Sequence, residues 1–385
     1  MLKNRHIPFL TWLFGSIMLL MTAACSSSDD EGGQGVDKKS ATLAVYVYAP
    51  EQAAAKKKGP LTRGDVGEVD AITNEGTINS LQIWIYESES GDYVGYFNTE
   101  DVTALNQGQG TTYQLPVSDD FANKEPKPNV NVYVMANVKA ENCGVGTLDK
   151  GTSRSELIAG AKITGHFGLS DLQTSVPTDG LPMAGMLTLQ PVVGDAPALR
   201  VGNLSQVSTV QLTRAVSKLR FVFSKTKDQP TVSITSIKID EGMIPNVEYL
   251  FDKPESVTID YNTSASELKL SDINDIAETT DPTDYIYLNQ DAQEYEDLID
   301  GAGLTVNGPI YLRESDKQLV GTITYKIADG EEQIVDFQMQ QAGDFLRNHT
   351  WIVYAYYAGS GKLRVQTVYV KNWENRNFDY EFFNW

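Results

Sequence analysis

The sequence has little of what an enzyme or a metal site needs. It holds three histidines and two cysteines among 385 residues, and His166 and His349 stand alone in Gly-His-Phe and Asn-His-Thr contexts. None of the motifs G-x-S-x-G, G-x-x-x-x-G-K-[ST] or G-x-G-x-x-G is present, so the sequence indicates neither a nucleophile elbow nor a phosphate-binding loop. We therefore expect a protein that is not an enzyme and that binds no metal and no cofactor.

Positive charge is also scarce. The chain has 31 Lys and Arg against 51 Asp and Glu, a formal net charge of −20. Without a basic stripe to displace counterions from phosphates, we expect no nucleic-acid partner. The one basic cluster is Lys56–Lys58. A solvated, protease-accessible loop explains this cluster better than a patch for nucleic acid or an anionic membrane.

Carboxylates are plentiful, but none forms an evident catalytic pair. Asp272, Asp275, Glu278, Asp281 and Asp284 lie in a loop-like, Thr-rich stretch, where solvated charge is the ordinary state. A calcium loop of the EF-hand type would need alternating Asp or Asn ligands and a glycine, which this stretch lacks. A surface hydrolase with a glycosidase-like acid pair remains an alternative that counting alone does not remove.

The first residues form a targeting segment. A charged start is followed by the apolar run Ile7–Met21, too short to span a bilayer comfortably as a helix, and then by small residues before Cys25. This arrangement resembles a bacterial lipoprotein signal, so we expect residues 1–24 to be the signal peptide and Cys25 to carry the lipid, palmitate included. A plain secretory signal is the alternative. The run Ser28–Glu31 resembles the acidic sorting tag of Bacteroidetes surface lipoproteins, so we expect the protein on the outer face of the cell.

Cysteine usage fits that route. Once Cys25 carries lipid, only Cys143 remains, so no intrachain disulfide can form. Residues 25–40 are polar and Gly-rich, and we expect a flexible tether there.

A strand-like run directly precedes a basic loop in residues 41–63. In Thr42–Tyr48 the side chains of Leu43, Val45 and Val47 share one face, and Ala44, Tyr46 and Tyr48 share the other, as the two-residue period of a strand requires. Such a strand should be buried on both faces. The loop Lys56–Arg63 is rich in targets for a trypsin-like protease. We interpret the strand as a removable part.

Strand signals dominate the rest of the chain, each bounded by Gly, Asn, Asp or Pro. The best helix candidate is Ser153–Ile163, which opens with Ser153 and Glu156 at capping-box spacing. We expect an all-β fold of two antiparallel β-sandwich domains with short helices in the loops. The expected strands are Thr77–Glu87, Tyr93–Phe97, Thr111–Val117, Asn129–Val138, Met186–Val192, Val207–Phe223 (as two strands or one long bent strand), Thr231–Ile239, Pro309–Arg313, Gln318–Ile327, Gln333–Gln340, Thr350–Ala358 and Leu363–Trp373.

Two details of the second half are expected from its patterns. Lys218 and Arg220 alternate with Leu219, Phe221 and Phe223, which indicates that the charged pair lies on an edge or solvent face. Thr231–Ile239 changes its apolar register near Ser236, which indicates a bulge. We place one domain in residues 64–204 and the other in residues 205–373.

Residues 374–385 extend beyond the last expected strand. In Asn377–Trp385 the side chains of Phe378, Tyr380 and Phe382 share one face, and Phe383 and Trp385 share the other. This extension is a candidate donor strand for another chain. The alternative is that it pairs within its own domain.

Five stretches together are similar to the fimbrillins, the fimbrial subunit superfamily of Bacteroidetes, and the resemblance covers essentially the whole chain in order. They are the signal ending in Cys25, Tyr133–Val138, Leu181–Gly185, Leu212–Arg220, and Val368–Trp373 with the terminal Trp385.

The resemblance implies two transthyretin-like β-sandwich domains and the work of a pilin that supports adhesion. Members of this superfamily travel as lipoproteins and are cut after an arginine by a trypsin-like surface protease. The cut falls here between Arg63 and Gly64, and a neighbouring subunit then replaces the lost strand. The tripeptide Arg63-Gly64-Asp65, which integrin-type receptors recognise, would be split by it.

The expected partners follow from the same resemblance. They are other fimbrial subunits, the protease, the membrane through the lipid anchor before cleavage, and a receptor on a host or bacterial surface. A polymerising stalk subunit is the expected role, because the chain has both Arg63 and an apolar C-terminal extension. A tip or anchor subunit and a surface glycan-binding lipoprotein are the alternatives.

Overall fold

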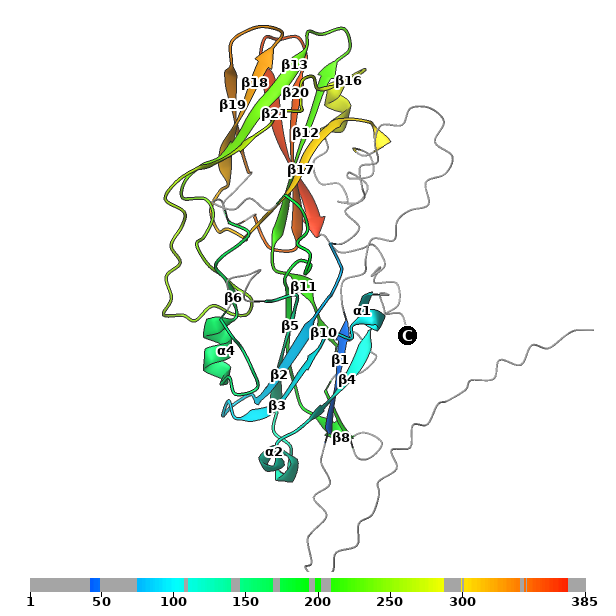
Figure 1. The fold of residues 1–385 in the computed structure, drawn as a ribbon, viewed down its shortest axis with the longest axis vertical. Coiled ribbons are helices and arrows are strands. Elements are labelled where there is room, and N and C mark those ends of the chain that lie inside the picture. The colour runs from blue at the N-terminus through cyan, green and yellow to red at the C-terminus, as the bar shows by residue number, and fades with distance from the viewer. Residues whose placement is uncertain are drawn as a thin grey trace, which may run out of the picture. The chain divides into compact units, whose positions relative to one another are not determined.

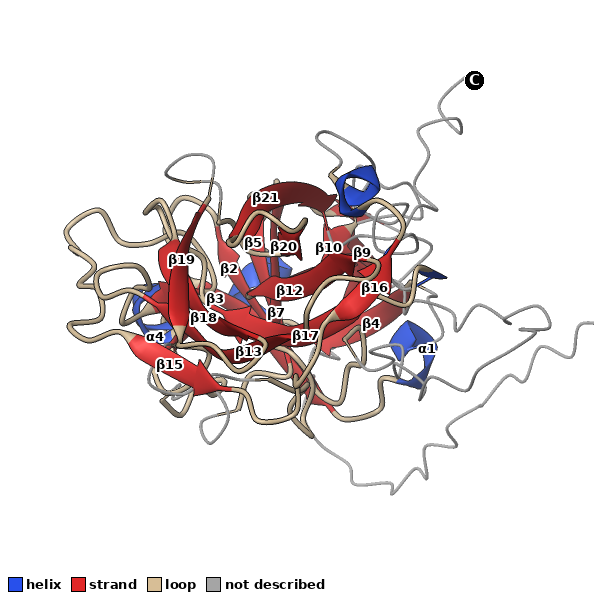
Figure 2. Ribbon diagram, turned by 90° about the horizontal axis from the view of Figure 1, so that it is seen from above, coloured by secondary structure: helices blue, strands red, loops and turns tan. Residues whose placement is uncertain are grey.

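Strands are the main secondary structure of the described residues in the computed structural model (Figures 1 and 2). The structure describes residues 42–48, 75–106, 110–139, 146–168, 174–193, 198–201, 209–286, 299, 301–339, 343 and 345–372. Helices in this part of the chain are short and lie in the connections between strands. The all-β sandwich fold expected from the sequence is confirmed.

The first half of the described chain contains three α-helices and eleven strands. Their bounds are β1 Thr42–Tyr48, β2 Leu81–Glu87, β3 Tyr93–Thr99, α1 Thr103–Asn106, β4 Thr111–Pro116, α2 Asp119–Asn123, β5 Val130–Ala136, α4 Arg154–Gly160, β6 Lys162–Ile163, β7 Met183–Leu189, β8 Val192–Val193, β9 Ala198–Val201, β10 Val210–Gln211 and β11 Thr213–Arg214.

The second half has ten strands and one 3-10 helix among its described residues. Their bounds are β12 Ser217–Thr226, β13 Val232–Ile239, β14 Glu248–Tyr249, β15 Ser266–Lys269, β16 Ala277–Thr279, η2 Pro282–Tyr285, β17 Thr305–Leu312, β18 Val320–Ile327, β19 Gln333–Gln338, β20 His349–Tyr357 and β21 Leu363–Asn372.

Two sheets enclose the core of the N-terminal sandwich. Sheet 1 has the order β10-β1-β9-β8 with β4 on the other side of β1, and sheet 2 has the order β11-β7-β5-β2-β3. Their facing side chains form one apolar cluster, to which β1, β2, β4, β5 and β7 all contribute. The alternating valines of β5, Val130, Val132 and Val134, are all fully buried in it, as expected.

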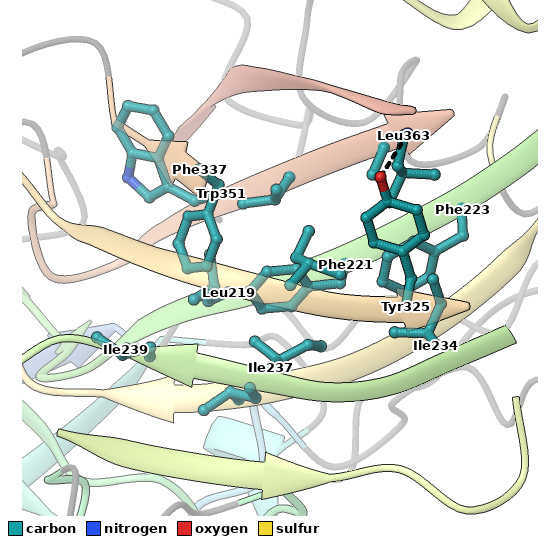
Figure 3. Close-up of a cluster of buried hydrophobic side chains, with 14 of the residues drawn as sticks. Leu219, Phe221, Phe223, Ile234, Ile237, Ile239, Tyr325, Phe337, Trp351 and Leu363 are labelled. Carbon is teal, nitrogen blue, oxygen red and sulfur yellow. Dashed lines mark hydrogen bonds between the residues drawn. The ribbon is translucent and has the colours of Figure 1, made fainter. Parts of the chain in front are cut away.

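The C-terminal sandwich repeats this plan. Sheet 3 has the order β16-β12-β20-β21 with β17 also paired to β12, and sheet 4 has the order β15-β13-β18-β19. Figure 3 shows Leu219, Phe221 and Phe223 of β12 facing the side chains of β13 across this core. The Tyr325 hydroxyl accepts a hydrogen bond from the Leu363 amide at 3.1 Å, the dashed line in Figure 3.

The local signals read from the sequence appear in several places. Helix α4 begins with the expected capping box: the Glu156 amide donates to Ser153 Oγ at 3.3 Å, and the Ser153 amide donates to Glu156 Oε2 at 2.9 Å. The pairing of β13 with β18 shifts register between Ile234 and Ser236, which is the expected bulge.

Most ladders are antiparallel, but the first strand of each sandwich also pairs in parallel. β1 runs parallel to β9 and β10, and β12 runs parallel to β20 and β16. The described residues 42–372 all belong to one compact unit. The boundaries drawn from the sequence at 24/25, 40/41, 63/64, 204/205 and 373/374 stay predictions.

Candidate functional site

The expected removable strand is an inner strand of sheet 1. β1 pairs antiparallel with β4 on one side, where Thr42–Val47 face Pro116–Thr111. On its other side it pairs in parallel first with β9 and then with β10 (Figure 1). Both edges of β1 therefore carry ladder hydrogen bonds, so removing it would leave two rows of backbone groups without partners.

One face of β1 is completely buried. Leu43, Val45 and Val47 are each 0% exposed and belong to the core shared with sheet 2. Leu43 lies opposite Leu115 and Val45 opposite Tyr113 in the register with β4. Burial, with a smaller contribution from Asp101, raises the pKa of Tyr113 to about 12, so its phenol stays neutral beside Val45.

The second face of β1 is covered less completely than the sequence suggested. Ala44 is buried, but Tyr46 is only half-buried. The Tyr46 ring lies against Gly110, since a Cβ at that glycine would come within 1.9 Å of the Tyr46 hydroxyl. The expectation of burial on both faces is therefore met by Ala44 and only in part by Tyr46.

The chain resumes in the structure at Glu75, and the residues Glu75–Ser80, here called the lead-in segment, precede β2. Side chains bind the backbone of this segment in place of a strand ladder. Asn106 accepts from the Ile78 amide and donates to the Ile78 carbonyl, both at 2.7 Å. Asn137 accepts from the Asn79 amide at 2.8 Å and donates to the Thr77 carbonyl at 2.7 Å.

Asn137 can do this because of its backbone conformation. Its φ is 59°, in the left-handed region that asparagine tolerates better than most residues. It is fully buried, and its amide group also donates to the Leu181 carbonyl at 2.9 Å. Gly180 lies so close that a Cβ there would be 2.3 Å from Asn137 Nδ2. Glycine at position 180 is required by this packing.

Several predicted site residues lie outside the described part of the chain. These are the lipidation residue Cys25, the cleavage residues Arg63 and Gly64, and the donor-strand residues Phe378, Tyr380 and Phe382. Leu43, Val45 and Val47 are the predicted site residues that the structure places.

One expectation from the sequence is wrong. Lys218 and Arg220 do not lie on a solvent face: they are 4% and 5% exposed. β12 is an inner strand with partners on both sides, and Lys218 is paired with Glu75, which lies 143 residues earlier in the chain. A lysine on the outward face of an inner strand can be buried when the partner comes from a distant segment, which alternation alone does not reveal.

Glu248, Glu314 and Arg347 help to line a groove of about 560 Å³. Arg347 Nη2 lies 2.6 Å from Glu314 Oε1 and 3.3 Å from Glu248 Oε1. The two carboxylates are thus already bound by the protein's own arginine. Burial raises the pKa of Glu248 to about 8, opposed by Arg347.

Two kinds of feature are absent from the described residues. No cluster of three or more His, Cys, Asp or Glu in them has the arrangement of a metal site. Within the same residues, every helix is too short or too polar to cross a bilayer.

Comparison with known proteins gives one family match. Residues 41–214 match the family model of the major fimbrial subunit protein, FimA. The matched region starts one residue before β1 and ends with β11. The resemblance seen in the sequence is therefore confirmed over this region. No curated protein matches the chain.

Solved structures similar to the chain are remote in sequence. A putative cell adhesion protein from Parabacteroides distasonis is 15% identical with a TM-score of 0.48, covering 86% of this chain and 97% of its own. A second one, from Bacteroides eggerthii, is 13% identical with a TM-score of 0.48, covering 88% and 98%. The tip fimbrial protein Mfa3 from Porphyromonas gingivalis, with a C-terminal truncation, is 12% identical with a TM-score of 0.45, covering 85% and 98%. Likeness at this level carries no argument about function.

Proposed function

We propose that this chain, whose residues 41–214 match the model of the major fimbrial subunit family, is a structural subunit of a cell-surface fimbrium. It is made as a lipoprotein anchored at Cys25, cut between Arg63 and Gly64, and polymerised by exchange of its first strand. Its partners are other fimbrial subunits and a trypsin-like surface protease, and the polymer supports adhesion to a receptor on a host or bacterial surface.

The observation that carries the proposal is the position of β1. It is an inner strand of sheet 1, yet it is joined to the remainder of its sandwich through residues 49–74, which hold Lys56–Lys58 and Arg63. Cutting there separates a fully paired strand from its sandwich and leaves the other described strands of the sandwich uncut.

Loss of β1 creates a strong acceptor. Leu43, Val45 and Val47 each contribute roughly 1.5–3 kcal/mol by burial. Their removal exposes the apolar side chains that packed on them and leaves the edges of β4 on one side, and of β9 and β10 on the other, without the ladder that β1 supplied. A strand from another chain satisfies both needs by β-augmentation. A head-to-tail contact of this kind that does not close on itself grows into a filament.

The replacing strand must meet two conditions. It has to run in the same direction as β1, because only then is it antiparallel to β4 and parallel to β9. It must also present apolar residues at alternate positions. The tail Asn377–Trp385 meets the second condition with Phe378, Tyr380 and Phe382. These rings are larger than the Leu, Val and Val that they would replace, so the core must open to take them.

The test compares the surface form of three chains expressed with their own signal: the unchanged protein, Arg63→Ala, and Lys57→Ala as the matched control in the same loop. We expect the unchanged chain and the Lys57 variant to start at Gly64 by N-terminal sequencing and to give SDS-resistant ladders. The Arg63 variant should keep an upstream start and remain monomeric. Ladders from the Arg63 variant, or a surface form that starts at Cys25 in all three, would contradict the proposal.

The identity of the donor has its own test. A chain that ends at Asn377 should be cut normally but fail to form ladders. If this shortened chain polymerises as well as the full one, the tail is not the donor strand, while the removal of β1 stands.

A further inference from the structure

Glu75, the first described residue after the predicted cleavage loop, is buried among charged and polar partners. It is 8% exposed, its Oε2 lies 3.2 Å from Lys218 Nζ, and its Oε1 accepts from the Tyr311 hydroxyl at 2.7 Å. Lys218 is 4% exposed and Tyr311 is fully buried. A carboxylate this deep is stable only because it is paired and hydrogen-bonded.

The backbone and the phenol reinforce this pairing. Arg214 Nε donates to the Glu75 carbonyl at 3.0 Å, and Arg214 Nη1 donates to Asn348 Oδ1 at 3.3 Å. Burial, and then the charge of Glu75, raise the pKa of the Tyr311 phenol well above its ordinary value. The phenol therefore stays protonated and remains a donor to the carboxylate. We call Glu75, Lys218, Tyr311 and Arg214 the clasp.

The clasp joins the lead-in segment, whose core includes β1 side chains, to sheet 3, which has no contact with β1 in its core or its ladders. Glu75 begins the lead-in to β2, and the core around Ile78 and Leu81 also contains β1 side chains. Lys218 lies on β12 and Tyr311 on β17, both in sheet 3, and neither the core of the C-terminal sandwich nor sheet 3 includes any residue of β1. The carboxylate of Glu75 is thus held by strands that lose nothing when β1 leaves.

We propose that Glu75 is a positioning residue for strand exchange: the clasp fixes the chain at residue 75, so that loss of β1 does not spread into the lead-in segment and β2. This proposal rests on the proposed function, since it concerns the state in which β1 has gone. β2 is an inner strand of sheet 2, between β5 and β3. If the chain unfolded locally from the new N-terminus toward β2, sheet 2, which faces the groove that β1 leaves, would open. Contacts that hold the lead-in segment in place limit local unfolding of this kind.

The test uses the full chain with Lys56–Lys58 replaced by the recognition sequence of a sequence-specific protease, so that the cut does not depend on Arg63. Glu75→Gln keeps the size of the side chain and removes its charge. Tyr311→Phe removes one hydrogen bond and keeps the ring. If the Glu75 variant does not fold, Tyr311→Phe tests the clasp proposal in its place. Asp275→Asn is the matched control, because Asp275 pairs at 2.7 Å with Lys225, a buried lysine on the same strand β12 as Lys218.

Hydrogen exchange is measured on each chain before the cut and again after the fragment that carries β1 has been released. Urea is used for the release if needed, and gel filtration checks that the fragment has left. We expect the released form of the unchanged clasp to keep its protection in Thr77–Glu87. In the released Glu75→Gln form the amides of Thr77–Glu87 should exchange at least about tenfold faster. In the released Tyr311→Phe form their exchange rate should rise by a smaller factor. Before the cut, the differences should be smaller, because β1 still supports the segment. A residue with a merely structural role would shift both forms equally.

The outcomes separate the two proposals. If the released Glu75→Gln and Tyr311→Phe forms keep the protection of the unchanged clasp, or if Asp275→Asn loses as much in Thr77–Glu87, the clasp proposal is overturned. The same holds if β1 leaves only with global unfolding. A surface form that is not cut at Arg63, or that makes no ladders, contradicts the proposed function and leaves the clasp result intact.

Discussion

The first strands of the two sandwiches, β1 and β12, hold the same place in their sheets. Each is an inner strand with an antiparallel partner on one side, β4 for β1 and β17 for β12. Each has a parallel partner on the other side, β9 for β1 and β20 for β12. Topology therefore does not distinguish a strand that we propose to be removable from one that is permanent.

The attachment of the two strands does distinguish them. β12 ends at Thr226 and β13 begins at Val232, so a short turn ties it into its sandwich. β1 ends at Tyr48 and β2 begins at Leu81, with the basic loop between them. β12 is also longer, ten residues against seven. A long connection makes a strand separable, and a short turn makes it permanent.

Burial of the two faces differs in the same sense. β12 packs one face on the core of its own sandwich through Leu219, Phe221 and Phe223 and the other on a second cluster through Val222. β1 has one completely buried face and a second face on which Tyr46 is half-buried. Fewer buried groups on β1 mean that less free energy opposes its release.

The largest expected effect is that of Phe221→Ala in β12. Phe221 is fully buried, with its ring centroid 5.2 Å from that of Phe337, and truncation should lower the free energy of unfolding by about 3–5 kcal/mol. Chemical denaturation should give the same loss before and after the cut in residues 49–74. A loss that disappears on cutting would mean that β12 is also replaceable.

Val45→Ala is the matched change in β1 and should cost about 2 kcal/mol, since two methyl groups leave a fully buried site. Its effect should be present in the uncut chain and absent once β1 has been released. If the released form is still destabilised by this change, β1 has not left, and the contrast between the two strands fails.

The sequence predicted β1 with the bounds that the structure shows, because the unbroken apolar run of Thr42–Tyr48 is a local property. The start of β2 was expected at Thr77 and lies at Leu81. The backbone of Thr77 and Asn79 is bound by the Asn137 side chain rather than by a strand ladder. Apolar and β-branched residues look alike in both situations, so this difference was not visible in the pattern.

The clasp was missed for a different reason. Lys218 and Arg220 alternate with large apolar residues, which is also the pattern of a strand with one solvent face. The partner of Lys218 is Glu75, 143 residues away, and no spacing rule joins the two. The motif Leu212–Arg220, noticed only as a family resemblance, contains both Arg214 and Lys218 of the clasp. The closely spaced charged residues among the apolar residues of this motif were the one pattern in the sequence that could have indicated buried charge.

Glu248 predicts a pH dependence that belongs to neither first strand. Burial raises its folded-state pKa from the ordinary 4.5 to about 8, with Arg347, Glu314 and Arg313 as its charged neighbours. The folded chain therefore holds a proton that the unfolded chain has lost between these two values, so stability falls as the pH rises through that window. A pKa difference of this size corresponds to a loss of roughly 3–4 kcal/mol in the free energy of unfolding between pH 5 and pH 8.

Thermal unfolding across this range should show the slope in the unchanged chain and a flatter profile in Glu248→Gln, whose side chain is neutral at every pH. Cut and uncut forms should have equal slopes, because the group does not contact β1. Unequal slopes would indicate that release of β1 changes the surroundings of Glu248. The effect of release would then not be confined to the N-terminal sandwich.

The smallest expected effects test the second faces of the two strands with the same substitution. The Tyr354 hydroxyl of β20 is buried between Ser224 of β12, at 2.6 Å, and the Pro282 carbonyl, at 2.7 Å, so Tyr354→Phe should cost about 1 kcal/mol. Tyr46→Phe on the half-buried face of β1 should change stability by less than about 0.5 kcal/mol. Denaturation of the uncut chains measures both, and the difference should survive in a double variant because the two sites share no partner. An equal cost would mean that the second face of β1 is held as firmly as that of β12, leaving the length of the connection as the feature that makes β1 separable.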